Sequence, residues 1–142
     1  YAEGEAELGW VNLSARLVEV SSAIDLDHLA SGLVRRVASM VTDAGGEIAH
    51  VKVSVLGGDC QAVANVVAND LQVDVGLAAK RSVSGSLQIV INARVALEPQ
   101  ELEEICHDAV GEVTSSYDAT LEVGLSHALR PGRPVPTYRV TI

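Results

Sequence analysis

Apolar and polar residues alternate one by one along several stretches of this chain, most clearly over residues 10–20. Val11 and Leu13 fall on one side of an extended backbone there, and Asn12 and Ser14 fall on the other. A period of two over this length predicts a strand with one buried face and one face in water. Parallel sheets covered by helices on both faces need strands that are apolar on both sides. The pattern therefore favours a mainly antiparallel sheet with one open face.

The same alternation predicts further strands, which cover residues 48–56, 71–78, 87–95 and 119–126, with a weaker one at 61–67. Gly57, Gly58 and Asp59 predict a turn, and Asn69-Asp70 predicts a break after the weak strand. The polar segment 80–86 is interpreted as a loop or a hairpin tip.

Two other stretches show the helical period of about 3.6 residues. The first has its apolar stripe at Leu26, Leu29, Leu33, Val37, Met40 and Val41, and Gly45-Gly46 predicts its end. The second begins at Glu98-Pro99, since proline suits the first helical position, and its stripe is Leu102, Ile105, Ala109, Val110 and Val113.

This order of elements predicts the α+β class. We expect a two-layer α/β sandwich of the ferredoxin-like (split βαβ) plan with one or two extra strands, a mainly antiparallel sheet and both helices on one face. The predicted organisation is a linker remnant at 1–8, a single domain at 9–127 and a Pro/Arg-rich tail at 128–142.

Charge and composition exclude some partners. The formal net charge is −9, and only 10 of the 142 residues are Lys or Arg. Nucleic acid and anionic membranes both attract clustered basic residues, so we expect neither as a partner. No apolar run approaches the roughly 20 residues of a membrane span. Two cysteines without a C-x-x-C spacing favour reduced thiols and a cytoplasmic location.

Side chains that can bind metals are scattered along the chain, at His28, His50, His107, His127, Cys60 and Cys106. Cys106 and His107 are adjacent on a predicted helix and point about 100° apart, so they do not share one ion easily. His50 and His127 are the best candidates for a pair. We assign no metal ligand and expect no cofactor in this segment.

The sequence contains no motif that identifies a catalytic residue either. Asp25 and Asp27, and the Glu residues at 101, 103 and 104, lie at predicted helix starts, where carboxylates stabilise the helix dipole. The glycine pairs continue into no Walker A motif. We assign no catalytic residue.

The polar sides of the strands are expected to share one open sheet face, made of Asn12, Ser14, Arg16, His50, Lys52, Gln72, Asp74, Gln88, Asn92, Arg94 and Glu122. This face is either simply solvated or a docking surface for another domain, a second copy or a ligand. The tail adds Arg130 and Arg133, and we expect its prolines to stiffen it into a strap with Tyr138 and Val140 as apolar anchors.

The stretches "LGWVNLSARL", "AHVKVSVL", "LQIVINARV", "LEPQELEEI" and "RPGRPVPTYRV" resemble the C-terminal domain of CobW-like GTPases. That family has an N-terminal P-loop GTPase domain and works in metal or cobalamin-related trafficking. The resemblance implies a non-catalytic docking domain whose partner is the GTPase domain of the same chain, or a homo-oligomer. GTP and a divalent metal would then belong to the parent protein.

The partner-binding residues we predict are Arg16, His50, Lys52, Asn92, Arg94, Arg130 and Arg133. Two alternatives stay open. One is a stand-alone ferredoxin-like module that dimerises or binds a small ligand. The other is a small enzyme that uses His50 and the open face as its pocket.

Overall fold

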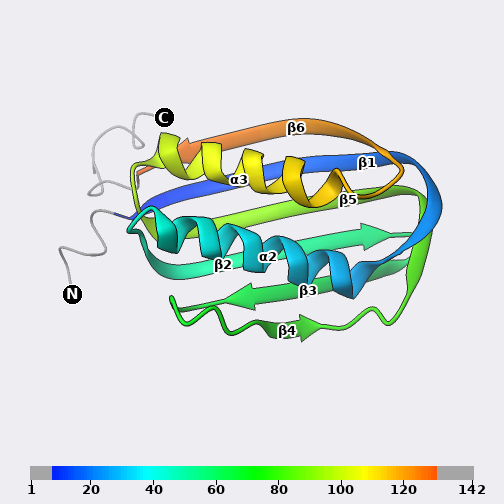
Figure 1. Ribbon diagram of the computed structural model, residues 1–142, viewed down its shortest axis with the longest axis horizontal. Helices are drawn as coiled ribbons and strands as arrows, with labels where there is room; N and C mark the ends of the chain where they lie inside the picture. Colours follow the sequence, from blue (N-terminus) through cyan, green and yellow to red (C-terminus); the bar gives the residue numbers. More distant parts are fainter. Residues whose placement is uncertain (1–7, 131–142) are drawn as a thin grey trace, which may run out of the picture.

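Six strands form one antiparallel open sheet in the computed structural model, and two helices lie across one of its faces (Figure 1). The structure describes residues 8–130. In chain order the elements are β1 (Gly9–Asp25), α2 (Leu26–Asp43), β2 (Glu47–Gly57), β3 (Cys60–Val66), β4 (Asp74–Leu77), β5 (Ser82–Ala96), α3 (Pro99–Thr114) and β6 (Thr120–Leu129). Residues 1–7 of the predicted linker remnant and 131–142 of the predicted tail lie outside this range.

The strand order across the sheet is β4-β3-β2-β5-β1-β6, with every neighbouring pair antiparallel. β5 lies between β1 and β2, so the unit β1-α2-β2 is split by a strand from later in the chain. In the same way β1 lies between β5 and β6 and splits the unit β5-α3-β6. The predicted α+β class and antiparallel sheet are therefore confirmed.

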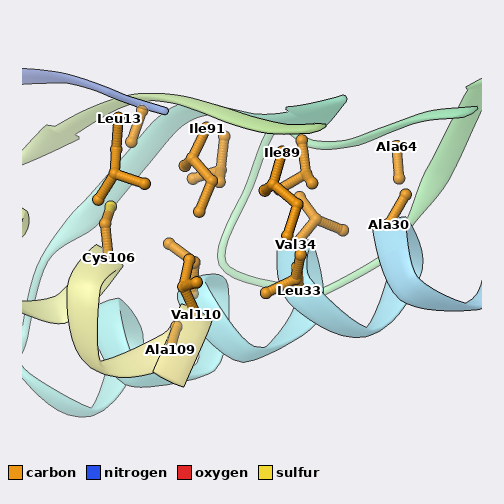
Figure 2. Packing of buried hydrophobic residues seen from close by; sticks show 14 of the residues in the cluster. Leu13, Ala30, Leu33, Val34, Ala64, Ile89, Ile91, Cys106, Ala109 and Val110 are labelled. Atoms are coloured by element: carbon orange, nitrogen blue, oxygen red, sulfur yellow. The ribbon is translucent and has the colours of Figure 1, made fainter. Parts of the chain in front are cut away.

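The core fills the space between the helices and the inner sheet face. Leu13, Ile89 and Ile91 point from the strands toward the helices, where Val34 and Val110 meet them (Figure 2). These side chains are at most 1% exposed. Their burial removes apolar surface from water, which stabilises the fold by about 25 cal/mol per Å². Because the inner residues are the apolar members of each alternating strand, the polar members face away from both helices.

Local signals explain where the helices begin and end. Asp25 caps α2 by accepting a 3.1 Å hydrogen bond from the backbone N–H of His28. Gly45 follows the helix with φ 83°, a conformation that glycine adopts without strain. Pro99 begins α3, as predicted. Asp27 does more than complement the helix dipole, because its carboxylate also accepts hydrogen bonds from the backbone N–H groups of Ala79 and Lys80.

The interpretation of residues 80–86 as a loop or a hairpin tip was wrong from Ser82 onward, because β5 begins there. The extra strand residues pair with a matching extension of β1, in which Val20 lies opposite Gly85 and Ile24 opposite Val83. A change of register separates this extension from the rest of the pair, and Glu19 lies there with φ 55°. A bulge of this kind adds a residue to one strand and hides its alternation from sequence inspection.

The predicted strand at 71–78 is shorter in the structure, where β4 covers only Asp74–Leu77. Leu71 has φ 59°, which interrupts the extended backbone, and the Asp70 carboxylate accepts a hydrogen bond from the N–H of Gln72. At the other end of the chain, β6 continues to Leu129, two residues into the predicted tail.

Candidate functional site

The open face of the sheet carries most of the polar residues that the alternation predicted, namely Asn12, Ser14, Arg16, His50, Lys52, Asp74, Gln88, Asn92, Arg94 and Glu122. Those on β1, β2 and β5 alternate along their strands with residues buried under the helices. Gln72 lies outside any strand, so its predicted place on this face was wrong. Within residues 8–130 no helix or strand packs over this face, because both helices pack on the other one (Figure 1).

A hollow of about 300 Å³ opens in this face over strands β1, β5 and β2. Its lining residues are Trp10, Asn12, His50, Lys52, Asn92, Ala93 and Arg94. The strand register brings them together in two rows. Trp10, Arg94 and His50 lie opposite one another in the first row, and Asn12, Asn92 and Lys52 do so in the second.

Hydrogen bonds and stacking hold several of these side chains in place. Asn92 Nδ2 donates to Asn12 Oδ1 at 2.5 Å, across β5 and β1. His50 Nε2 donates to Asn65 Oδ1 on β3 at 2.7 Å. The Arg94 guanidinium lies 5.7 Å from the centroid of the Trp10 ring, within the range of a cation–π interaction. The side chains of the hollow are therefore held in fixed positions, from which they can donate hydrogen bonds to a bound group.

The hollow has a positive character in a strongly acidic chain. None of its lining residues is acidic, and among the described residues neither Lys52 nor Arg94 forms an ion pair with a carboxylate. The helix layer has the opposite character. A second hollow of about 420 Å³, between the end of α2 and the start of α3, is lined by Asp43, Glu101, Glu104 and Asp108 but by no basic residue.

The other predicted partner-binding residues lie elsewhere. Arg16 is on the same face but outside the hollow, where it lies 3.8 Å from Glu122, and both side chains are more than half exposed. Arg130 follows β6 and forms a 2.8 Å ion pair with Glu98, the residue before α3. Exposed pairs of this kind contribute about 0–1 kcal/mol. Arg133 lies outside the described residues.

The suggested pairing of His50 with His127 was wrong. His50 is on β2 and His127 is on β6, and strands β5 and β1 lie between them. Neighbouring strands are about 4.8 Å apart, so the backbones of β2 and β6 are separated by about 14 Å. In the part of the chain that the structure describes, no three His, Cys, Asp or Glu side chains lie close enough to hold a metal ion.

A separate polar cluster joins α3 to β6 on the helix side of the sheet. The Ser126 hydroxyl donates a hydrogen bond to the Glu103 carboxylate. His107 Nε2 lies 3.4 Å from the hydroxyl oxygen of Ser126. The hydroxyl hydrogen of Ser126 points to the Glu103 carboxylate and not to His107. This geometry does not match a serine that is activated by an adjacent histidine base. The cluster instead fastens the edge strand to the helix beneath it.

The two cysteines are expected to react very differently with thiol reagents. Cys106 is fully buried in the core, on the face of α3 that packs against the sheet (Figure 2). Burial, with a smaller contribution from the Glu103 carboxylate, raises the pKa of Cys106 to about 12. At about pH 8 it stays a protonated thiol, which is unreactive. Cys60 is only partly buried.

A disulfide reagent should therefore label one thiol per folded chain quickly, and both thiols in denaturant. Mass spectrometry of the labelled peptides identifies the reacting cysteine. Equal labelling rates for Cys60 and Cys106 in the folded chain would contradict the burial of Cys106.

Sequence reasoning missed two residues of this region, Trp10 and Asn65. Trp10 has the same parity as Asn12 and Ser14, so extending the alternation by one step places it on the open face. Asn65 belongs to β3, where the alternation is weak because small apolar residues such as Val63 share its face. Its contact with His50 depends on the pairing of β3 with β2.

A search for helices able to cross a membrane finds none among the described residues. A scan against protein-family models gives no match, and a search of curated proteins gives none either. Among solved structures the chain is similar to a hydantoinase/carbamoylase family amidase from Burkholderia ambifaria, with a TM-score of 0.43 and 11% sequence identity. The similarity covers 82% of this chain but only 27% of the amidase. Likeness of this degree carries no argument about function.

Proposed function

We propose that this chain is a non-catalytic docking module of the kind found as the C-terminal domain of CobW-like GTPases. The partner is a P-loop GTPase domain of the same polypeptide, and the biological context is metal or cobalamin-related trafficking. GTP and a divalent metal belong to that GTPase domain. The module uses a ferredoxin-like plan enlarged by β3 and β4, a reading supported by the two interleaved β-α-β units.

The observation that supports docking is the hollow on the open face. Its seven lining residues include an exposed tryptophan, two charged groups without a carboxylate partner among the described residues, and a bonded pair of amides. Trp10 is 36% exposed. Tryptophan and arginine are the side chains that most often dominate protein interfaces, and they act by losing contact with water on binding.

The docking proposal requires a P-loop GTPase domain in the same polypeptide, and the test uses that domain. Isotope-labelled chain is mixed with this domain, and binding is followed by NMR. We expect the largest shift at the indole N–H of Trp10, the only tryptophan in the chain. Val90 lies at the centre of the open face, between Ser14 and Ser54 of the neighbouring strands. Val90→Glu should weaken binding by about tenfold or more, because a bulky negative charge there blocks close contact.

Arg35→Glu is the matched control, since Arg35 is exposed on α2 in the helix layer. It should leave the affinity within about twofold of the original. Shifts confined to the helices, or equal losses from both variants, would refute docking through the open face.

A second candidate, a stand-alone module that dimerises, is favoured by the outer edge of β6, along which no strand pairs within residues 8–130. This strand exposes Val123, Leu125 and Leu129, with Leu125 76% exposed. An uncovered edge strand can add a strand from another copy through its unpaired backbone groups. Light scattering separates the two candidates. A dimer that is lost on Leu125→Lys but retained on Val90→Glu supports the edge, and a monomer removes this candidate.

A further inference from the structure

We propose that the hollow binds the carboxylates of an extended acidic segment of the partner, with the pattern Glu-x-Glu. The inference rests on the docking function proposed above and names the chemistry that the same surface recognises. Lys52 and Arg94 receive one carboxylate each, His50 and the Asn12–Asn92 pair line the site beside them, and Trp10 forms one wall.

Charge is the first argument. Lys52 and Arg94 bring two positive charges to a surface without a carboxylate in its lining, although the chain as a whole has a net charge of −9. The acidic hollow lies in the helix layer, on the other side of the sheet. A sheet and the layer packed on it are about 10 Å apart, which is also the screening length at about 0.1 M salt. Two carboxylates of the open face, Glu47 opposite Ala96 and Asp74 opposite Asn65, lie outside the lining of the hollow. An anion that enters the hollow therefore meets Lys52 and Arg94 first.

Geometry is the second argument. Lys52 on β2 lies directly opposite Asn92 on β5, and Arg94 is two residues further along β5. Such diagonal neighbours on a sheet face are about 7–8 Å apart. In an extended peptide, side chains at positions i and i+2 point the same way and are separated by about 6.8 Å. Two glutamates with one residue between them therefore match the spacing of the two cations.

The chemistry of the hydrogen-bond donors also favours binding of a planar carboxylate over binding of a spherical anion. The Arg94 guanidinium is planar, and stacking on the Trp10 ring fixes its orientation. An oriented guanidinium can give two parallel hydrogen bonds to one carboxylate. Lys52 is half-buried between Asn92 on β5 and Asn65 on β3. Its ammonium group therefore has few bound water molecules to lose when a second carboxylate binds.

Trp10 makes the test direct, because it is the only tryptophan and lines the hollow. The full chain is titrated with the peptide acetyl-Gly-Glu-Ala-Glu-Gly-amide while Trp10 fluorescence is recorded. We expect a saturable change that weakens as sodium chloride rises from about 0.05 M to about 0.5 M, since salt screens ion pairs. Lys52→Gln should raise the dissociation constant by about tenfold, because one charge-assisted contact is lost.

Arg35→Gln removes the same charge from the helix layer and should leave the dissociation constant unchanged within about twofold. The chain itself contains Glu3, Glu5 and Glu7 at the same spacing. The titration is therefore repeated with all three changed to glutamine, so that they do not compete with the peptide. The peptide should bind this variant at least as tightly as it binds the original chain.

Three outcomes would overturn the inference. One is equal binding of the peptide acetyl-Gly-Gln-Ala-Gln-Gly-amide. Another is tighter binding of inorganic phosphate than of the acidic peptide, which would identify a phosphate site. The third is an equal loss of binding in Lys52→Gln and Arg35→Gln. Docking of the P-loop domain without any binding of the acidic peptide refutes this inference alone, whereas peptide binding without docking refutes only the proposed function.

Discussion

Replacing Ile91 with alanine is expected to lower the free energy of unfolding by about 2–5 kcal/mol, the usual range for removing a large aliphatic side chain from a core. Ile91 is completely buried on β5, near the centre of the sheet, between Leu13 of β1 and Val53 of β2. Figure 2 shows it pointing toward α3, where Val110 lies. Strands on both sides and a helix below leave little freedom for the site to collapse around the lost atoms.

Urea unfolding followed by circular dichroism measures this effect. Val90→Ala is the control, because Val90 is the next residue and faces the open side of the sheet. It loses fewer buried atoms, and we expect less than about 1 kcal/mol of destabilisation. Domains of this kind are stable by about 5–15 kcal/mol, so the Ile91 variant should remain measurable. Similar losses from both variants would contradict the assignment of the two faces.

Replacing Asn69 with alanine is expected to cost about 2–3 kcal/mol, because one side chain satisfies three partners. Asn69 Oδ1 accepts from the backbone N–H of Ile48 at 3.0 Å. Its Nδ2 donates to the backbone carbonyl of Gly46 at 2.9 Å and to the hydroxyl of Thr42 at 2.8 Å. Asn69 therefore joins the connection between β3 and β4 to the turn that leads from α2 into β2. Alanine leaves the groups of Ile48 and Gly46 without these bonds.

The same urea experiment measures the Asn69 variant, and Asp70→Ala serves as its control. Asp70 makes one local hydrogen bond, to the N–H of Gln72, and its side chain is exposed. Its loss should cost less than about 1 kcal/mol. Hydrogen exchange adds a local measurement, since the amide of Ile48 should exchange faster in the Asn69 variant. An unchanged exchange rate at Ile48 would show that Asn69 does not hold this junction.

The sequence predicted the two-layer arrangement because alternation and helical periodicity report directly on which side of an element is buried. Val11 and Leu13 on β1, and Ile89 and Ile91 on β5, are the apolar members of their strands, and all four are buried. The positions of both helices followed from their stripes and end signals in the same way. These signals are local, so they need no knowledge of which strands are neighbours.

The arrangement of the candidate site could not be predicted, because it depends on strand order and register. Sequence inspection placed His50 and His127 as possible partners, yet two strands separate them. It placed Arg16 in the same group as Arg94, but only Arg94 lines the hollow. The bulge near Glu19 and the left-handed conformation of Leu71 also had no clear signal, since both residue types normally avoid positive φ.

The pairing of β1 with β5 has a consequence for how the chain folds. The bonded amides Asn12 and Asn92 are 80 residues apart in the sequence, and both line the hollow. Contacts between residues so distant along the chain form slowly, because a long loop must close before they gain anything from each other. The hollow is thus absent from any nascent or truncated polypeptide that ends before β5, and it can form only after the chain has been synthesised through Ala96.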